Sequence, residues 1–237
     1  MLIGAIDDSQ RAAAKIAGIA FLVTNATAMF AEFYVNSRLV VTGNGARTFA
    51  NIAASQTLYR LGIASHLFTG AAVVALIVAL YVILRPVNRN LALLALSWRL
   101  VETAIFAASV LPGFDVLRLV SSAAYLRGFA PDRLQALTML SLSAHGAAYV
   151  VGLLFFGLGS AVFCYLFYKS NYIPRLLAGL GVFASVLTSA CMFAIIIFPD
   201  LSHRLVPGCF APIFIFEAVT GFWLLIKGLA QPNPTLQ

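Results

Sequence analysis

Six ionisable residues stand inside stretches of this sequence that are otherwise apolar. One such stretch, LSWRLVETAIF, carries an arginine and a glutamate three positions apart. An ionisable side chain inside a membrane costs roughly 2.5 to 3.5 kcal/mol even on a lenient insertion scale, so each is expected either to pair with another or to serve a function. The six candidates for a polar ligand pocket are Glu32, His66, Arg99, Glu102, His145 and Glu217.

Histidine and carboxylate side chains together suit two kinds of chemistry. Imidazole nitrogens and carboxylate oxygens are ligands of Zn²⁺ and iron, so one hypothesis is a metal centre formed by His66, His145 and a carboxylate from Glu102, Glu32 or Glu217. Buried acids and histidines can also take up and release protons near neutral pH, which is what a proton-coupled carrier needs. The Glu-x-x-His and H-E-x-x-H signatures are absent, so no known metalloenzyme motif supports the first hypothesis.

Structural roles for the same residues remain open. Arg99 and Glu102 are three positions apart and share one face of a helix, so they can neutralise each other. Glu32 lies near a helix end and could sit at the membrane interface beside Tyr34 and Arg38. Each histidine could equally be a hydrogen-bonded core residue.

Composition indicates the elements that must position these groups. The chain has 237 residues, of which 62% are hydrophobic and 10% charged, whereas a soluble domain carries about 25% charged residues. One span needs about 20 apolar residues, so there is room for roughly six or seven. We therefore predict an all-α, polytopic transmembrane helix bundle that forms a single integral-membrane domain over residues 1–237.

The formal charge of +7 does not indicate nucleic-acid binding, because the basic residues lie mainly between the apolar runs. There they contact lipid headgroups and set the orientation. The predicted spans are 16–36, 59–84, 91–111, 139–168, 174–198 and 210–228.

Loop lengths predict the orientation of the bundle. The loops RPVNRN and KSNYIPR are short and basic, while the segments 37–58 and 112–138 are long. Basic residues in short loops mark the cytoplasmic side, so both termini are predicted to be cytoplasmic. The long segments would then cover the outer end, and 114–129 would be either an interfacial amphipathic helix or a packed connector.

Depths estimated at about 1.5 Å per residue bring most of the six residues to one level. Glu32 and Glu102 lie about 24 and 17 Å from the cytoplasmic ends of their spans. His66, His145 and Glu217 lie about 8 to 11 Å from the outer ends. In a hydrocarbon core about 30 Å thick these five share the outer half, with Arg99 one turn below Glu102.

Cysteine and small residues predict packing rather than chemistry. Cys164, Cys191 and Cys209 form no CxxC or other metal spacing, so we expect neither a disulfide nor a thiolate metal site. The stretches HGAAYVVGLLFFGLGSA and LLAGLGVFAS are rich in small residues, which let helix backbones approach closely.

Several motifs resemble one bacterial membrane-protein family. The stretches EFYVNSRLVV, LYRLGIASHLF, LYVILRPVNRNLALLALSWRLVE, HGAAYVVGLLFFGLGS, LFYKSNYIPRLLAGLGVFAS and FEAVTGFWLLIKGL occur in order between about residues 13 and 229. They resemble the family called domain of unknown function 4386. The resemblance implies a multi-pass protein of the bacterial cytoplasmic (inner) membrane and implies no mechanism. His66 stands where many relatives have an aspartate, and His145 matches a histidine of the family pattern.

The leading hypothesis is a membrane protein that binds a small or lipidic ligand in a polar pocket in the outer half of the bundle. The second is a metal-dependent membrane enzyme that uses the His and Glu cluster with zinc or iron. The third is a proton-coupled carrier, although no internal repeat or matching pair of broken helices supports it. Whether the protein is an enzyme, and which protein partners it has, does not follow from the sequence.

Overall fold

The computed structural model describes residues 6–121, 126 and 128–231, with the backbone alone at 203, 204, 206 and 207. These residues form helices and turns, with no strand among them. In chain order the elements are α1 (Asp8–Met29), the π-helix η1 (Phe30–Asn36), α2 (Ser37–Leu39), α3 (Gly45–Ala54), α4 (Gln56–Leu84), α5 (Arg89–Ser109), α6 (Leu111–Leu119), α7 (Pro131–Ser170), α8 (Arg175–Ile197), the 3₁₀ helix η3 (Pro199–Leu201) and α9 (Ser202–Ile226).

Within the part of the chain that the structure describes, six helical stretches are long and apolar enough to cross a membrane, which confirms the predicted all-α bundle of six spans. Helices α4, α5 and α8 agree with the second, third and fifth predicted spans to within three residues at each end. By contrast, α1, α7 and α9 each begin eight residues earlier than predicted, at Asp8, Pro131 and Ser202. The early turns of these helices carry polar residues or proline, which hydropathy alone assigns to loops.

Local signals in the sequence explain several helix ends. Asp7 and Gln10 form a reciprocal capping box at the start of α1, with Gln10 N–H donating to Asp7 Oδ1 at 2.7 Å and Asp7 N–H to Gln10 Oε1 at 3.2 Å. Asn88 Oδ1 accepts from Leu91 N–H at 3.0 Å and caps α5. Just after α7, Asn171 adopts a left-handed conformation with φ of 58°, which stops the helix.

The chain divides into two compact units. Unit 1 comprises Met1–Asn25, Ala71–Thr103 and Val150–Gln237, and unit 2 comprises Ala26–Gly70 and Ala104–Tyr149. Helices α8 and α9 belong wholly to unit 1, and η1, α2, α3 and α6 belong wholly to unit 2. The single integral-membrane domain expected from the sequence stays a prediction.

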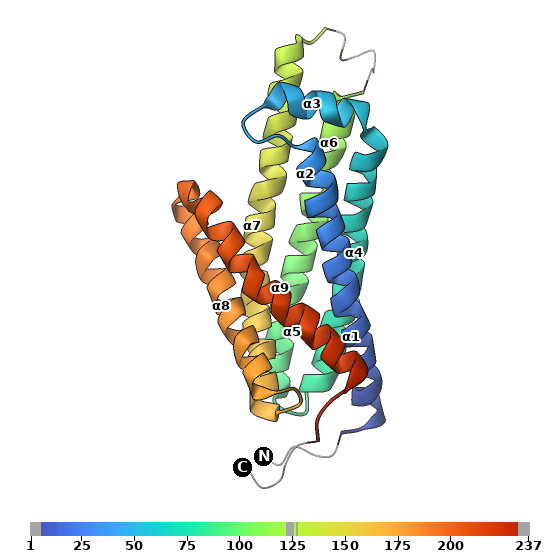
Figure 1. The fold of residues 1–237 in the computed structure, drawn as a ribbon, viewed down its shortest axis with the longest axis vertical. Coiled ribbons are helices and arrows are strands. Elements are labelled where there is room, and N and C mark those ends of the chain that lie inside the picture. Colours follow the sequence, from blue (N-terminus) through green and yellow to red (C-terminus); the bar gives the residue numbers. More distant parts are fainter. Residues whose placement is uncertain (1–5, 122–125, 127, 232–237) are drawn as a thin grey trace. The chain divides into compact units, whose positions relative to one another are not determined.

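In unit 1, α8 and α9 lie side by side and are joined by a disulfide between Cys191 and Cys209 (Figure 1). The expectation of no disulfide is therefore wrong. Because α8 and α9 run antiparallel after the short η3 turn, residues 18 positions apart meet across the helix pair. That pairing depends on tertiary neighbours, which no local cysteine spacing reveals. Cys164 remains a free, buried thiol.

Glycines in unit 1 stand where helices come closest, as the small-residue stretches predicted. A Cβ at Gly18 of α1 would lie 2.9 Å from the carbonyl oxygen of Gly221 and 2.8 Å from Leu225 Cγ, both in α9. A Cβ at Gly157 of α7 would lie 2.7 Å from the carbonyl oxygen of Ser185 in α8. These contacts require a residue without a side chain.

Tyr172, in the YKSNYIPR turn, ties several segments of unit 1 together. Its side chain is fully buried, and its hydroxyl accepts from Gln10 Nε2 at 3.3 Å. The same amide nitrogen donates to the Ile83 carbonyl at 2.9 Å, and Ala230 N–H donates to the Tyr172 carbonyl at 2.9 Å. Burial raises the pKa of the Tyr172 hydroxyl, which therefore stays neutral at pH 7.

In unit 2, α3 lies across other helices of the unit (Figure 1). Gly45, its first residue, lies against Met139 of α7. An apolar cluster fixes the other end of α3 to η1, α2 and α6; its buried members are Val35, Leu39, Ile52, Val116 and Val120. The first part of the segment 114–129 is therefore a packed connector, α6, whereas positions 122–125 and 127 lie outside the described residues.

We predict that unreduced protein exposes one alkylatable thiol after denaturation and three after reduction, because Cys191 and Cys209 are bonded and Cys164 is free. The measurement is the mass increase after alkylation of protein purified without reductant. A Cys164→Ser variant, as the control, should show no labelling before reduction. Three labelled thiols in unreduced wild-type protein would contradict the disulfide.

We also predict that Gly18→Ala destabilises the protein by about 1 to 3 kcal/mol, because the new methyl group overpacks the α1–α9 contact. Gly146→Ala is the matched control, since a Cβ there meets nothing within 4 Å; that change should be neutral or stabilising by up to about 1 kcal/mol through helix propensity. Unfolding in mixed micelles measures both. Equal stability of the two variants would argue against the close contact.

Candidate functional site

The structure separates the six predicted residues into two clusters. Glu32, His66 and His145 belong to unit 2, whereas Arg99, Glu102 and Glu217 belong to unit 1. Glu32 stands beside the two histidines in unit 2, and Glu102 stands beside Arg99 in unit 1.

The unit 2 cluster brings together three side chains from three different helices. One potential ligand atom from each of Glu32, His66 and His145 lies within 4.8 Å of the other two. His66 Nε2 is 3.6 Å from Glu32 Oε1. The centroids of the two imidazole rings are 5.6 Å apart, with the ring planes tilted by 60°. All three residues are partly buried, so the cluster is sheltered but reachable.

Glu32 is presented by a π-helix rather than by a regular α-helical turn. The π-helix η1 spans seven residues and follows α1 directly. Such segments are rare and occur often at functional sites, because the wider turn changes the direction of its side chains. The second carboxylate oxygen, Oε2, accepts a hydrogen bond from Asn36 Nδ2 at 3.0 Å. One oxygen of Glu32 is thereby held in place while the other faces His66.

His66 is positioned by a close contact between α4 and η1. Gly62, one turn earlier on α4, approaches Val35 so closely that a Cβ would lie 2.9 Å from Val35 Cγ1. The neighbouring Ser65 donates its hydroxyl to the Thr27 carbonyl at 2.9 Å, which fixes α4 against α1 and uses the serine structurally. The backbone of α4 can therefore come near enough for His66 to reach Glu32.

His145 is oriented by a backbone carbonyl. Its Nδ1 lies 2.7 Å from the carbonyl oxygen of Ser109. A carbonyl oxygen can only accept, so Nδ1 carries the proton and Nε2 is left with its lone pair. The ring also lies near that of Tyr149, at 6.2 Å between centroids, and Tyr149 stacks on Phe106 at 4.9 Å. The tautomer and orientation are those of a metal-binding histidine with a carbonyl as its outer partner.

The spacing of the cluster suits a shared ion better than direct hydrogen bonding. A hydrogen bond between nitrogen and oxygen measures about 2.7 to 3.2 Å, and the 3.6 Å between His66 and Glu32 exceeds that range. Two ligands of one tetrahedral zinc, each bound at about 2.0 to 2.1 Å, lie about 3.3 to 3.4 Å apart.

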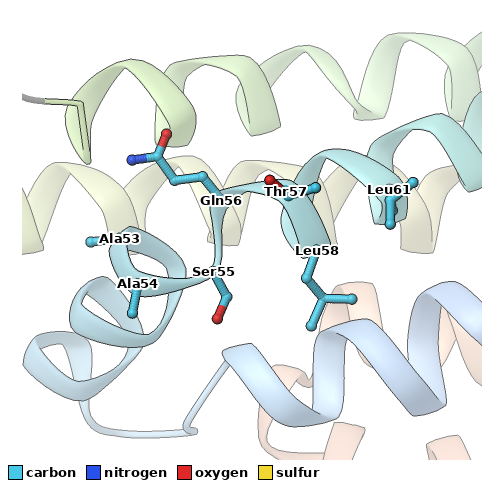
Figure 2. A pocket seen from close by; sticks show the side chains of 7 residues that line it. All are labelled: Ala53, Ala54, Ser55, Gln56, Thr57, Leu58 and Leu61. Carbon is cyan, nitrogen blue, oxygen red and sulfur yellow. The ribbon is translucent and has the colours of Figure 1, made fainter.

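Two hollows in unit 2 differ in their chemistry. The one lined by His66, His145 and Asn36, together with Tyr59, has a volume of about 40 Å³, enough for an ion with a water molecule. A larger, open pocket of about 550 Å³ lies where α3 ends and α4 begins (Figure 2). Its polar lining consists of serine, glutamine and threonine, with no titratable side chain. The smaller hollow is the one that the two histidines line.

The unit 1 cluster is a buried ion pair with a second acid. Arg99 Nη1 lies 2.9 Å from Glu102 Oε2, and the two side chains are 4% and 2% exposed. The guanidinium also lies over the ring of Phe156, at 4.4 Å. Glu217 of α9 interacts electrostatically with both members of the pair. The pairing of Arg99 with Glu102 follows the helical spacing seen in the sequence.

Sequence reasoning missed the groups that orient the unit 2 cluster. Asn36 is four positions after Glu32, a spacing that places two side chains on one helix face and could have identified it. The Ser109 carbonyl and the π-helix have no signal in residue type. Both depend on how the helices of unit 2 pack.

Two comparisons with known proteins found matches. The model of the family described as "Domain of unknown function (DUF4386)" matches residues 16–228. An uncharacterized protein of the archaeon Archaeoglobus fulgidus is 28% identical over 155 residues, which cover 65% of this chain and 76% of that protein. No solved structure matches the chain. This multi-pass membrane protein belongs to the DUF4386 family.

Proposed function

We propose that this membrane protein binds a divalent transition metal, zinc or iron, through Glu32, His66 and His145. The carrying observation is that three ligand atoms from three separate helices lie within 4.8 Å of one another. Two imidazoles and one carboxylate are a ligand set that zinc and non-haem iron use in proteins. The hydrogen bonds from Asn36 and to Ser109 supply the outer partners that such ligands commonly have.

The number of protein ligands favours a centre that does chemistry over a purely structural one. Structural zinc sites are closed by four protein ligands, whereas catalytic sites have three and keep a position for water or substrate. The hollow of about 40 Å³ beside His66 and His145 offers room for that water. A metal at this site would make bound water a stronger acid and a nucleophile near neutral pH. A metal-dependent membrane enzyme is therefore the function that the geometry supports best.

The size of the hollow makes a larger ligand the less supported alternative. Pockets for drug-sized ligands measure about 300 to 1,000 Å³, far more than the 40 Å³ at the cluster. A small or lipidic ligand in an enclosed polar pocket therefore stays a prediction from the sequence.

The charge pattern supports a location in the bacterial cytoplasmic membrane with both termini inside. Basic residues lie at the short connections, at Arg85 just after α4 and at Lys169 in the last turn of α7. The connections containing α2, α3 and α6 are long, and such segments cross membranes with little regard to charge.

We predict one zinc or iron per chain in protein purified without chelators, or after dialysis against zinc, measured by element-resolved mass spectrometry. Glu32→Gln and the double variant His66→Ala, His145→Ala should each lose it, because each removes a ligand. Glu102→Gln should keep it, since Glu102 belongs to the unit 1 cluster. Metal lost from Glu102→Gln but kept by Glu32→Gln would overturn this ligand assignment, and wild-type protein that takes up no metal would overturn the proposal.

We predict that Asn36→Ala weakens zinc affinity by about 10- to 100-fold, because the variant releases one oxygen of Glu32 from its hydrogen bond. Asn51→Ala is the control, since Asn51 bonds the Leu39 carbonyl instead. Competition with a chromophoric chelator measures both affinities. Equal affinities for the two variants would show that Asn36 does not support the metal ligand.

A further inference from the structure

A second, independent cluster in unit 1 carries charges that do not balance. Arg99 supplies one positive charge, and Glu102 and Glu217 supply two carboxyl groups. All three residues lie in helices of the structure that are long and apolar enough to cross a membrane. With both acids ionised, the cluster would hold a net negative charge away from water, which costs several kcal/mol.

The positions of the three side chains are fixed by surrounding helices. A Cβ at Gly159 of α7 would lie 2.6 Å from Arg99 Cγ, so the absence of a side chain there makes room for the arginine. Thr103 donates its hydroxyl to the Arg99 carbonyl at 2.8 Å, on the same helix as the ion pair. Glu217 forms a side-chain hydrogen bond with Asn25 of α1. The guanidinium is thus buried beside Glu102, and Glu217 is partly buried.

Several buried polar atoms in this part of unit 1 form no hydrogen bond with any residue that the structure describes. Arg99 Nη1 and Glu102 Oε2 face each other as an ion pair but are not aligned as a hydrogen bond, and neither bonds to another described residue. Thr220 Oγ1, one turn after Glu217, is also buried without a hydrogen bond to any residue that the structure describes. Buried polar atoms of this kind are rare in folded proteins. They mark a place where hydrogen bonding can change with protonation.

We infer that Arg99, Glu102 and Glu217 form an intramembrane proton-binding site, in which one of the two carboxyl groups carries a proton. One ionised carboxylate then balances Arg99, and the other acid is neutral and can donate a hydrogen bond. Among the described residues, the thiol of Cys164 on α7 also interacts with this cluster. Two carboxyl groups that interact with each other and with a single cation do not both ionise readily.

This site does not depend on the proposed metal centre, because its residues are different and belong to the other unit. Proton uptake and release inside a membrane span is what a proton-coupled step requires. The cluster thus gives a physical basis to the proton-coupled function that the sequence raised as its third hypothesis.

Infrared difference spectroscopy of the protein in lipid bilayers tests the inference. Wild-type protein at neutral pH should show the C=O stretching band of a protonated carboxylic acid, which shifts in D₂O. Glu102→Gln and Glu217→Gln should each abolish the band, since the one remaining acid is then ionised against Arg99. Asp115→Asn is the control and should leave the band unchanged, because Asp115 is exposed and paired with Arg118.

The wild-type spectrum needs no variant and decides the question even where a substitution prevents folding. A wild-type spectrum without a protonated acid would overturn the inference. So would a band that survives in either folded glutamine variant, because a single acid would then hold its proton alone.

Discussion

A hydrocarbon environment supplies no hydrogen-bond partner and no counter-charge, and this constraint governs the whole molecule. Backbone groups are satisfied within helices, so the described chain is helical and its spans are long. Side chains that carry charge must find partners on neighbouring helices. Helices come close where small residues allow it, as at Gly18, Gly62 and Gly159. The glycines thus let the helices approach closely, and the buried charged side chains find their partners where the helices are close.

The same constraint produces two polar clusters of different character. In unit 2, Glu32, His66 and His145 are partly buried, and hydrogen bonds with Asn36 and Ser109 orient the acid and one histidine. In this cluster one potential ligand atom of each side chain lies within 4.8 Å of the other two. In unit 1, Arg99 and Glu102 are almost fully buried and pair directly. Lone pairs that converge suit a cation, whereas an arginine among acids excludes one and favours a proton.

Sequence reasoning identified the spans and the six polar residues because hydropathy and charge are local properties. The rise per residue placed five of these residues at one depth in the membrane. It gives the height of a residue along the helix axis and not the direction in which its side chain points. For that reason it left open which carboxylate joins the histidines, and the structure brings Glu32 to them in unit 2 while Glu102 pairs with Arg99 in unit 1. The disulfide between Cys191 and Cys209 also depends on which helices are neighbours. Such relations arise from packing across long sequence separations.

X-ray absorption spectroscopy of the zinc-loaded protein tests the metal centre most directly, because it reports which atoms surround the ion. The cluster of Glu32, His66 and His145 predicts nitrogen and oxygen ligands at about 2.0 to 2.1 Å, with the outer-shell scattering of two imidazole rings. A sulfur shell at about 2.3 Å, or oxygen ligands without imidazole scattering, would show that zinc binds elsewhere and would contradict the proposed centre.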